Sequence, residues 1–407
     1  MKCGLIGEKL GHSFSPQIHK KLADYDYDLF EMSEEEVGPF LEKGDFHAIN
    51  VTIPYKKTVM PFLREISDEA RRIGSVNTIT HLPDGGLRGD NTDYYGFAYT
   101  VKKSGIEIKG KKVLVLGSGG ASMTARTVAA DLGASSVIII SRSGEDNYTN
   151  LDRHRDCGII INTTPVGMYP NTGFSPINLE LFPNLTGVLD MIYNPAKTQL
   201  LLDAEARGIP YSNGLPMLVA QAKAASERFT GEKIPDSEID RITDEIRRDT
   251  MNIILVGMPG VGKTTIGKRV AARLGREFVD TDDEIVARAG RNIPEIFAAE
   301  GEKAFRELET QVVADVTKRS GLVIATGGGV PTIPANINLL RQNSVVFFLK
   351  RDISRLAKNG RPISQSRDLG ELYAERLPKY RAVCDVEIEC GQNPEENCAN
   401  ILRHYNG

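Results

Sequence analysis

The sequence has few of the residue types that stabilise small or specialised proteins. It contains no tryptophan and five cysteines among 407 residues. The cysteines are scattered, odd in number and without a CxxC pair, which argues against a zinc site and against a disulfide framework. No apolar run approaches the ~18 residues that a membrane-spanning helix needs, and the first residues do not resemble a signal peptide. We therefore expect a cytoplasmic protein with reduced thiols.

The charge balance is nearly even. The formal net charge is −4 and the isoelectric point about 6.0, which argues against a general nucleic-acid binder. The composition, 41% apolar and 26% charged, is that of a globular protein, and the length predicts two or three domains. The expected partners are small molecules, neither nucleic acid nor a membrane, and both a monomer and a homodimer remain open.

Two glycine-rich segments of different kinds each follow a short apolar strand. The first, residues 117–122 (GSGGAS), follows the apolar run 113–116 and opens a predicted helix that reaches Leu132. Glycines in such a loop let the backbone turn tightly and approach a pyrophosphate, which then lies at the helix N-terminus. The segment predicts a dinucleotide site that includes Gly117, Ser118, Gly119, Gly120 and Ala121.

The second segment, residues 257–264, matches GxxxxGK[ST] in full and follows the apolar run 253–256. Backbone N–H groups of such a loop bind phosphates, the lysine reaches the β- and γ-phosphates, and the hydroxyl binds Mg²⁺. We predict that Lys263 is catalytic and that Thr264 binds the metal. The predicted nucleotide ligands are Gly260, Gly262, Lys263, Thr264 and Thr265.

The elements around these loops alternate between strands and helices. Residues 48–53 predict a strand stopped by Pro54, and residues 68–73 predict a helix ended by Gly74. Buried strands at 113–116, 137–140, 158–161 and 188–191, separated by helices, predict a parallel doubly wound sheet. Ile239, Ile242 and Ile246 recur at helical spacing, and a new strand begins at Asn252, so we expect a domain boundary near residue 249.

The residues after the second strand of this sheet bear on the dinucleotide. The strand 136–140 ends in Ser141-Arg142-Ser143, and a guanidinium with flanking hydroxyls suits the 2′-phosphate of NADP. Glu145 and Asp146 follow closely and count against this choice. NADP is nevertheless the favoured cofactor.

Seven short motifs occur in the first 248 residues. They are residues 11–16 (GHSFSP), 50–56 (NVTIPYK), 75–78 (SVNT), 89–93 (GDNTD), 162–168 (NTTPVGM), 190–195 (DMIYNP) and 213–222 (NGLPMLVAQA). In order and spacing they resemble the shikimate dehydrogenase family. The resemblance implies an α/β substrate-binding domain at 1–105, onto which helices of about 213–248 pack back, and a Rossmann-like NADP domain at 106–212.

The resemblance also implies roles for individual residues. Lys56 and Asp93 are the acid–base pair that delivers a proton while NADPH reduces 3-dehydroshikimate to shikimate. The implied substrate ligands are Ser13, Ser15, Thr52, Asn77, Asp93, Tyr193 and Gln221. The implied cofactor ligands, besides the glycine-rich loop, are Ser141, Arg142, Thr163, Gly214 and Met217. The chain between Arg142 and Asn162 is shorter than expected for the family, and residues 147–155 allow at most a short helix.

Further motifs follow the second phosphate loop. They are residues 280–282 (DTD), 301–306 (GEKAFR) with Glu309, 325–329 (ATGGG), 359–362 (NGRP) and 375–380 (ERLPKY). Residues 250–407 resemble a shikimate kinase, which implies a parallel P-loop NTPase-type α/β domain that uses ATP and Mg²⁺. By resemblance, Asp280 contributes to the metal site, Asp282 contacts the acceptor hydroxyl, and Arg361 is a catalytic and ATP-binding residue in a lid. Arg306, Arg376, Gly328 and Gly329 complete the acceptor site.

The leading hypothesis is a bifunctional enzyme of aromatic amino-acid precursor synthesis that makes shikimate and then phosphorylates it. In one alternative, the halves are ligand-sensing domains of a regulator without turnover. Such a regulator is expected to lose reactive groups, yet the sequence retains Lys56, Asp93, Lys263, Thr264 and Asp280. In another, the first half acts on quinate with NAD; the pair of Ser13 and Ser15, together with Arg142, disfavours this.

Overall fold

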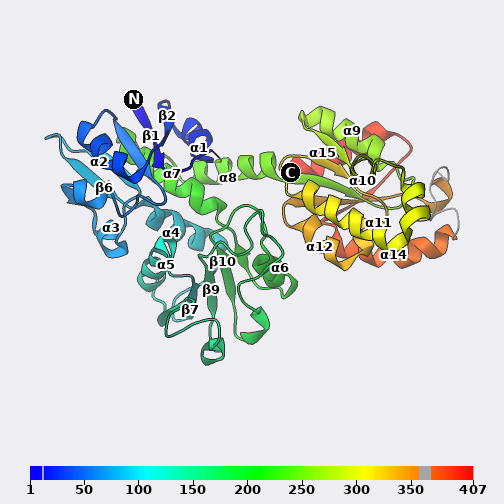
Figure 1. The fold of residues 1–407 in the computed structure, drawn as a ribbon, viewed down its shortest axis with the longest axis horizontal. Coiled ribbons are helices and arrows are strands. Elements are labelled where there is room, and N and C mark those ends of the chain that lie inside the picture. The colour runs from blue at the N-terminus through cyan, green and yellow to red at the C-terminus, as the bar shows by residue number, and fades with distance from the viewer. Residues whose placement is uncertain (12, 357–367, 407) are drawn as a thin grey trace. The chain divides into compact units, whose positions relative to one another are not determined.

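The chain has the predicted α/β class. The computed structural model describes residues 1–11, 13–356 and 368–406, and within them the strands form three sheets (Figure 1). The chain divides into two compact units. The first comprises Met1–Met168, Phe174–Tyr193 and Leu200–Glu245, and the second Tyr169–Gly173, Asn194–Gln199 and Ile246–Gly407.

The first sheet is mixed and has the strand order β2-β1-β3-β5-β6-β4. Its strands are β1 (Lys2–Gly7), β2 (Asp26–Glu31), β3 (Ala48–Val51), β4 (Glu65–Ile66), β5 (Thr78–His81) and β6 (Leu87–Asp90). The strand predicted to reach Ile53 ends earlier, because a turn in which the Tyr55 N–H donates to the Thr52 carbonyl begins before Pro54.

Helices cover both faces of this sheet. They are α1 (Ser15–Leu22), α2 (Glu34–Lys43), α3 (Asp68–Ile73) and α7 (Leu215–Thr230), with a 3₁₀ turn, η1 (Met60–Phe62). Ile49 packs with Val37 of α2 on one face, whereas Ala48 packs with Phe229 of α7 on the other. Neighbouring strand residues point to opposite faces, so one short strand serves two cores. Helix α3 ends at Gly74 in the left-handed conformation, as predicted.

The second sheet is parallel, in the order β11-β10-β9-β7-β8, as predicted. Its strands are β7 (Lys112–Leu116), β8 (Ser136–Ile140), β9 (Ile159–Asn162), β10 (Gly187–Asp190) and β11 (Tyr211–Ser212). Val113 and Val115 pack with α5 (Gly120–Asp131), whereas Leu114 and Leu116 share a core with α6 (Gln199–Ala206). The sheet is therefore doubly wound. The segment between β8 and β9 contains one short 3₁₀ helix, η2 (Leu151–His154), in agreement with the expected shortening; a further 3₁₀ helix is η3 (Leu179–Leu181).

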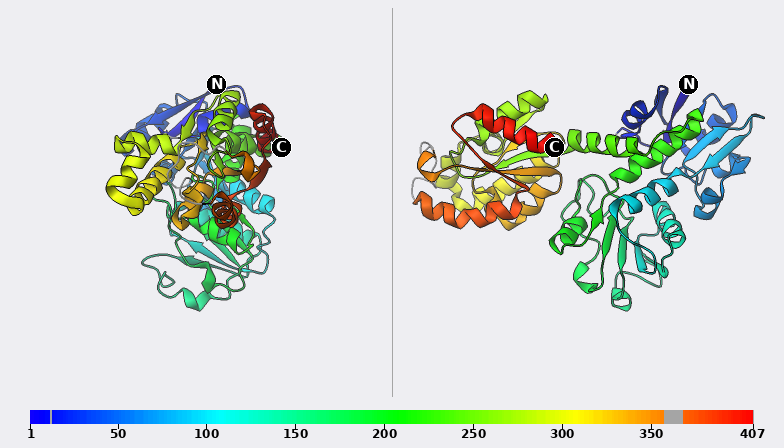
Figure 2. Two further views of the ribbon diagram at one scale, coloured as in Figure 1. Left: turned by 90° about the vertical axis from the view of Figure 1, so that its right-hand side faces the viewer. Right: turned by 180° about the vertical axis from the view of Figure 1, so that it is seen from behind.

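The third sheet is also parallel, in the order β13-β14-β12-β15-β16. The helix α8 (Ser237–Thr250), which buries all three predicted isoleucines, precedes it. Figures 1 and 2 show helices on both faces of this sheet. Its strands are β12 (Asn252–Val256), β13 (Phe278–Asp280), β14 (Val323–Ala325), β15 (Ser344–Lys350) and β16 (Val386–Glu389). Its helices are α9 (Lys263–Leu274), α10 (Thr281–Ala289), α11 (Ile293–Thr317), α12 (Pro334–Arg341), α14 (Leu369–Val383) and α15 (Pro394–Asn406), with 3₁₀ turns η4 (Val330–Thr332) and η5 (Ile353–Arg355).

None of the helices in the described ranges is both long and apolar enough to cross a bilayer.

Helix α4 (Thr92–Ser104) crosses α7 in direct contact at Gly96. A Cβ atom added at Gly96 would lie 2.7 Å from the Met217 carbonyl oxygen and 3.0 Å from Cβ of Gln221. Residues near the start of α4 are therefore held at a set distance from the side chains of α7. This crossing fixes part of the geometry of the first site described below.

We predict that Gly96→Ala destabilises the first unit. Overpacking costs about 1–3 kcal/mol, and the gain of about 1 kcal/mol in helix propensity that alanine brings only partly offsets it. The measurement is the free energy of unfolding from urea denaturation. Gly120→Ala, in the first turn of α5, is the matched control, because a Cβ there meets no atom within 4 Å; it should gain up to about 1 kcal/mol without the cost of overpacking. A Gly96→Ala variant that is as stable as Gly120→Ala would contradict the close crossing.

Candidate active sites

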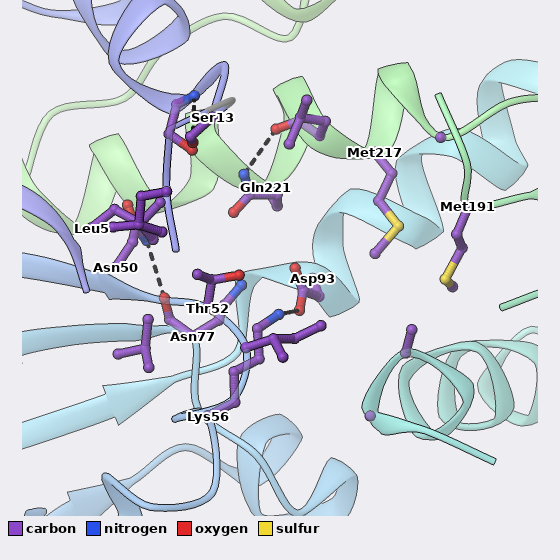
Figure 3. A pocket seen from close by; sticks show the side chains of 18 of the residues that line it. Leu5, Ser13, Asn50, Thr52, Lys56, Asn77, Asp93, Met191, Met217 and Gln221 are labelled. Atoms are coloured by element: carbon purple, nitrogen blue, oxygen red, sulfur yellow. Dashed lines mark hydrogen bonds and ion pairs between the residues drawn. The ribbon is translucent and has the colours of Figure 1, made fainter. Parts of the chain in front are cut away.

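The first unit contains a cavity of about 580 Å³ at the carboxyl ends of β1 and β3. Figure 3 shows its polar side chains, which come from the first sheet, α4 and α7, converging on one space. Residues of the glycine-rich loop line the same cavity. Of the residues predicted from the sequence, it brings together Ser13, Ser15, Thr52, Lys56, Asn77, Asp93, Gly120, Ala121, Tyr193, Gly214, Met217 and Gln221.

Lys56 and Asp93 form an ion pair at the centre of this cavity. The Lys56 Nζ donates to Asp93 Oδ2 over 2.6 Å, and the two side chains are 26% and 16% exposed. Asp93 lies in the first turn of α4, where Asn91 caps the helix by accepting from the Asp93 N–H. An ammonium held on a carboxylate, still open to the cavity, can donate a proton to an oxygen bound there.

Two asparagines orient the polar wall of the cavity. Asn77 is buried, and its Oδ1 accepts from the backbone N–H of Thr92 at 2.8 Å, so its Nδ2 is the group available to a ligand. Asn50 donates from Nδ2 to the Asn77 carbonyl at 3.1 Å and also lines the cavity. The sequence prediction omitted Asn50. Strand periodicity could have found it, because Asn50 and Thr52 are two residues apart along an extended segment.

Ser13 and Ser15 lie on the turn that opens α1. The Ser13 Oγ accepts from the Ser15 N–H at 3.2 Å, which fixes the turn, and both residues line the cavity. Phe14 between them packs edge-on against Tyr193, with ring centroids 5.9 Å apart. Burial raises the pKa of the Tyr193 phenol above its usual range, so its hydroxyl remains a hydrogen-bond donor at neutral pH. This end of the cavity thus offers neutral donors.

The glycine-rich loop after β7 fits a dinucleotide. Gly117 has φ of 103°, and a Cβ there would lie 2.8 Å from Thr163 Oγ1, so only glycine is compatible with this position. Gly119 and Gly120 have no atom within 4 Å of an added Cβ, which leaves the N-terminus of α5 open to a phosphate. Ser118 and Ala121 are exposed beside them, and Ser141 and the exposed Arg142 follow β8.

The end of this cavity at which nicotinamide was predicted to bind is shaped by another close backbone contact. A Cβ at Gly214 would lie 2.1 Å from the Met191 carbonyl oxygen. Met191 and Met217 both line the cavity, on the side of α5 (Figure 3). The sequence prediction included Gly214 and Met217 but not Met191, which follows the buried end of β10.

In the second unit, the loop between β12 and α9 fits a triphosphate. Gly257, Gly260 and Gly262 have φ of 145°, 83° and 107°, backbone conformations of the kind found in loops whose amides bind phosphate. The buried Lys263 Nζ donates to the carbonyls of Gly257 and Met258, at 2.9 and 3.1 Å, within that loop. Thr265 is exposed on the first turn of α9.

The next residue, Thr264, fits a Mg²⁺ site. Its Oγ1 donates to Asp280 Oδ2 at 2.7 Å, so two oxygen ligands lie together beside the phosphate loop. Mg²⁺ typically takes one or two protein oxygens, with phosphate oxygens and water completing its shell. Over residues 1–11, 13–356 and 368–406 no group of three or more acidic, histidine or cysteine side chains is placed to hold a metal. The oxygen pair thus suits a metal that arrives with a nucleotide.

The acceptor residues of the second unit meet around Gly327, Gly328 and Gly329. A Cβ at Gly327 would lie 2.7 Å from Asp282 Oδ1, and one at Gly329 would lie within 2.9 Å of three guanidinium atoms of Arg306. A Cβ at Gly328 would lie 2.8 Å from Pro259 of the phosphate loop. This glycine segment therefore joins the acceptor residues to the nucleotide loop.

Arg376 has the features of an anion ligand. It is 5% exposed, and its Nη1 donates to the Gly328 carbonyl at 3.2 Å. Its Nε is buried without a hydrogen-bond partner among the described residues. A buried unpaired donor is costly, and a carboxylate bound beside Gly328 would satisfy it bidentately. Tyr380, whose hydroxyl donates to the same carbonyl at 2.7 Å, supports this geometry and was not predicted as a site residue.

Glu309 is a further member of this set to which the sequence prediction assigned no role. Its Oε2 accepts from Arg306 Nη1 at 2.8 Å, and the residue is 1% exposed. Burial raises the pKa of the carboxyl group, and the guanidinium of Arg306 opposes this only in part. Helical spacing could have indicated it, because residues i and i+3 share a helix face. Arg361, predicted as catalytic and ATP-binding, lies outside the described residues.

Together the fold and the two sites define the class: a nicotinamide dinucleotide-dependent oxidoreductase and a P-loop phosphotransferase in one chain. Residues 5–79 match the family model for the shikimate dehydrogenase substrate binding domain, and residues 259–406 match the shikimate kinase model. The chain belongs to the shikimate dehydrogenase family and joins to it a shikimate kinase domain.

Individual relatives agree with this assignment. Shikimate dehydrogenase (NADP(+)) of Clostridium beijerinckii is 40% identical over 243 residues, which cover 55% of this chain and 90% of that protein. A chorismate mutase/shikimate 5-dehydrogenase fusion protein from Clostridium acetobutylicum superposes with a TM-score of 0.58 at 38% identity, over 60% of this chain and 96% of that chain. Shikimate 5-dehydrogenase from Thermus thermophilus, in complex with NADP(H) and shikimate, has a TM-score of 0.55 and 29% identity, over 60% and 99%. The family predicted from the motifs is confirmed.

We predict that Glu309→Gln changes how stability depends on pH. The pKa of this carboxyl is raised in the folded protein, so its protonated form favours folding. That contribution is present below its ordinary pKa of 4.5 and is lost as the pH rises through the folded pKa. The free energy of unfolding of the unsubstituted protein, minus that of Glu309→Gln, should therefore fall as the pH rises from the ordinary pKa of 4.5 through the raised folded pKa.

The control is Glu302→Gln, which removes the exposed carboxylate that pairs with the same Arg306, Nη2 to Oε1 at 3.3 Å. Because the Glu302 side chain is 65% exposed, the corresponding difference should stay flat over this pH range. A difference for Glu309→Gln that is flat or rises with pH would show that the ion pair, and not burial, governs this carboxyl.

Proposed function

We propose that this chain reduces 3-dehydroshikimate to shikimate with NADPH and then phosphorylates shikimate at its 3-hydroxyl with ATP and Mg²⁺. The observation that carries the first activity is the single cavity that is lined both by the Lys56–Asp93 pair and by Gly120 and Ala121 at the end of the dinucleotide loop. The family models for the two activities at opposite ends of the chain support the combination. The product of one site is the substrate of the other, which gives the fusion a chemical rationale.

In the first reaction NADPH, when bound, supplies a hydride to the carbonyl carbon. The Lys56 ammonium donates a hydrogen bond to the carbonyl oxygen and then its proton as the alkoxide forms, and Asp93 holds the ammonium in place. Ser13 and Ser15 bind the substrate carboxylate through neutral hydroxyl groups. Thr52, Asn77 and Gln221 pair with the ring hydroxyls, and Met217 excludes water on the nicotinamide side.

In the second reaction ATP with Mg²⁺, when bound, supplies the phosphoryl group. Lys263 and the amides of its loop bind the phosphates, and Thr264 with Asp280 binds the metal. Asp282 accepts a hydrogen bond from the attacking hydroxyl and so orients it toward the transferred group. Arg306 and Arg376 bind the acceptor carboxylate, and Glu309 holds the Arg306 guanidinium against Gly329.

We predict that Lys56→Met and Lys263→Met each remove one activity and spare the other. Loss of the proton donor should lower dehydrogenase kcat by about 10²–10⁴-fold, and loss of a transition-state cation should lower kinase kcat by about 10²–10³-fold. The dehydrogenase is followed by NADPH absorbance, and the kinase by mass spectrometric detection of shikimate 3-phosphate. Lys57→Met, an exposed neighbour of Lys56, is the control and should keep both activities.

The same experiment separates the alternatives. NADPH oxidation without shikimate 3-phosphate would contradict the bifunctional assignment. Binding of both nucleotides without any turnover would indicate a sensing protein, and faster oxidation of quinate with NAD than of shikimate with NADP would indicate a quinate dehydrogenase. A folded variant that loses both activities would show that the two sites are not independent.

A further inference from the structure

The segment that follows β8 is short and is folded on its own hydrogen bonds. The Ser141 N–H donates to the Asp146 carbonyl at 3.2 Å. Asn150 donates from Nδ2 to the Glu145 carbonyl and accepts from the Asn147 N–H at Oδ1, both at 2.9 Å. These bonds take the place of the longer strand–helix unit expected here, so side chains on this loop have defined positions although no regular element carries them.

Within this loop, Asp146 is paired with His154 of η2. The His154 Nε2 lies 2.8 Å from Asp146 Oδ1, and the two side chains are 9% and 28% exposed. An ionised carboxylate only accepts hydrogen bonds, so Nε2 carries the hydrogen and donates it. The His154 Nδ1 is buried without a hydrogen-bond partner among the described residues. Among the described residues, Asp146 is therefore the hydrogen-bond partner of the His154 ring.

The pair lies on the segment that follows β8, and the end of β8 is bonded to the dinucleotide loop. The Gly117 N–H donates to the Ile140 carbonyl at 2.8 Å, so the start of the dinucleotide loop is bonded to the end of β8. The exposed Arg142 is two residues further on, and Asp146 is four residues beyond Arg142. A free carboxylate at this place would repel a 2′-phosphate and accept a hydrogen bond from the 2′-hydroxyl of NAD instead.

We propose that His154 sets the preference for NADP over NAD by holding Asp146 away from the adenosine 2′-phosphate. The Arg142 guanidinium then faces the 2′-phosphate without repulsion from the Asp146 carboxylate. His154 acts through Asp146 and is a positioning residue. The inference rests on the proposed dehydrogenase activity and names what selects its cofactor.

The test uses the full-length protein and a binding probe that needs no turnover. Adenosine 2′,5′-bisphosphate and AMP report the contribution of the 2′-phosphate, and calorimetry gives both affinities. His154→Leu frees Asp146, so its affinity for the bisphosphate should fall about tenfold or more while that for AMP stays within about twofold. The NADPH-to-NADH ratio of kcat/KM should fall by the same factor.

Three further variants separate positioning from mere packing. His154→Gln keeps an N–H donor for Asp146 and should retain most of the preference. The double variant His154→Leu/Asp146→Asn removes the freed carboxylate charge and should restore the preference for NADP. Asp156→Asn, which removes an acid paired at the surface with Lys112 at 2.7 Å, is the matched control and should leave the preference unchanged.

Two outcomes would overturn the inference. One is an equal loss of both affinities in His154→Leu that the double variant does not restore, which would assign His154 a structural role only. The other is a tenfold rise in the affinity of the single variant Asp146→Asn for the bisphosphate. Such a rise would mean that Asp146 already repels the 2′-phosphate in the unsubstituted protein. This variant provides a test even where His154→Leu does not fold. Absence of NADPH oxidation in the unsubstituted protein would instead contradict the proposed function, and the probe affinities would still decide the inference.

Discussion

Both sites depend on backbone segments that approach one another more closely than any side chain would permit. Gly214 lies against the Met191 carbonyl, Gly96 lets α4 cross α7 in contact, and Gly117 packs on Thr163. In the second unit the absence of a side chain at Gly328 and Gly329 instead makes room for the side chains of Pro259 and Arg306. Such contacts leave a ligand little room to shift, because the groups around it are fixed by the main chain. The glycines of these motifs are thus needed for short distances between chain segments as much as for backbone flexibility.

The groups proposed to be catalytic come from strand ends and first turns of helices. Lys56 follows β3, Asp93 opens α4, and the two phosphate loops follow β7 and β12. A parallel strand ends where the next helix begins, so exposed polar groups and helix N-termini gather at one edge of each sheet while the apolar strands below stay buried. The same arrangement serves a hydride transfer in one unit and a phosphoryl transfer in the other, and only the side chains at the edge differ.

Most of the fold and much of each candidate site could be predicted from the sequence, because apolar runs and glycine loops are local features. Strand β3 was predicted too long, since hydrogen bonding of the Thr52 turn overrides β propensity. Asn50 and Glu309 lay within the motifs but were assigned no role, although their spacing, i+2 on a strand and i+3 on a helix, was available. The pair of Asp146 and His154 was not predictable, because it depends on the path of an irregular loop. Contacts made across loops need the structure.

Both sites are proposed to bind the same small acid, the first with neutral donors and the second with positively charged ones. In the proposed function the first site binds the carboxylate with the Ser13 and Ser15 hydroxyls and keeps the Lys56 ammonium for the oxygen on which charge develops, so binding and chemistry do not compete for one cation. The second works beside a triphosphate, and neutral donors would not hold an anion against that charge. Its proposed ligands are Arg306 and Arg376, and the buried Glu309 accepts a hydrogen bond from Arg306. Burial raises the pKa of the Glu309 carboxyl, and the guanidinium that it orients lowers this pKa only in part. The differing charge at the two sites follows from the cofactor that each must accommodate.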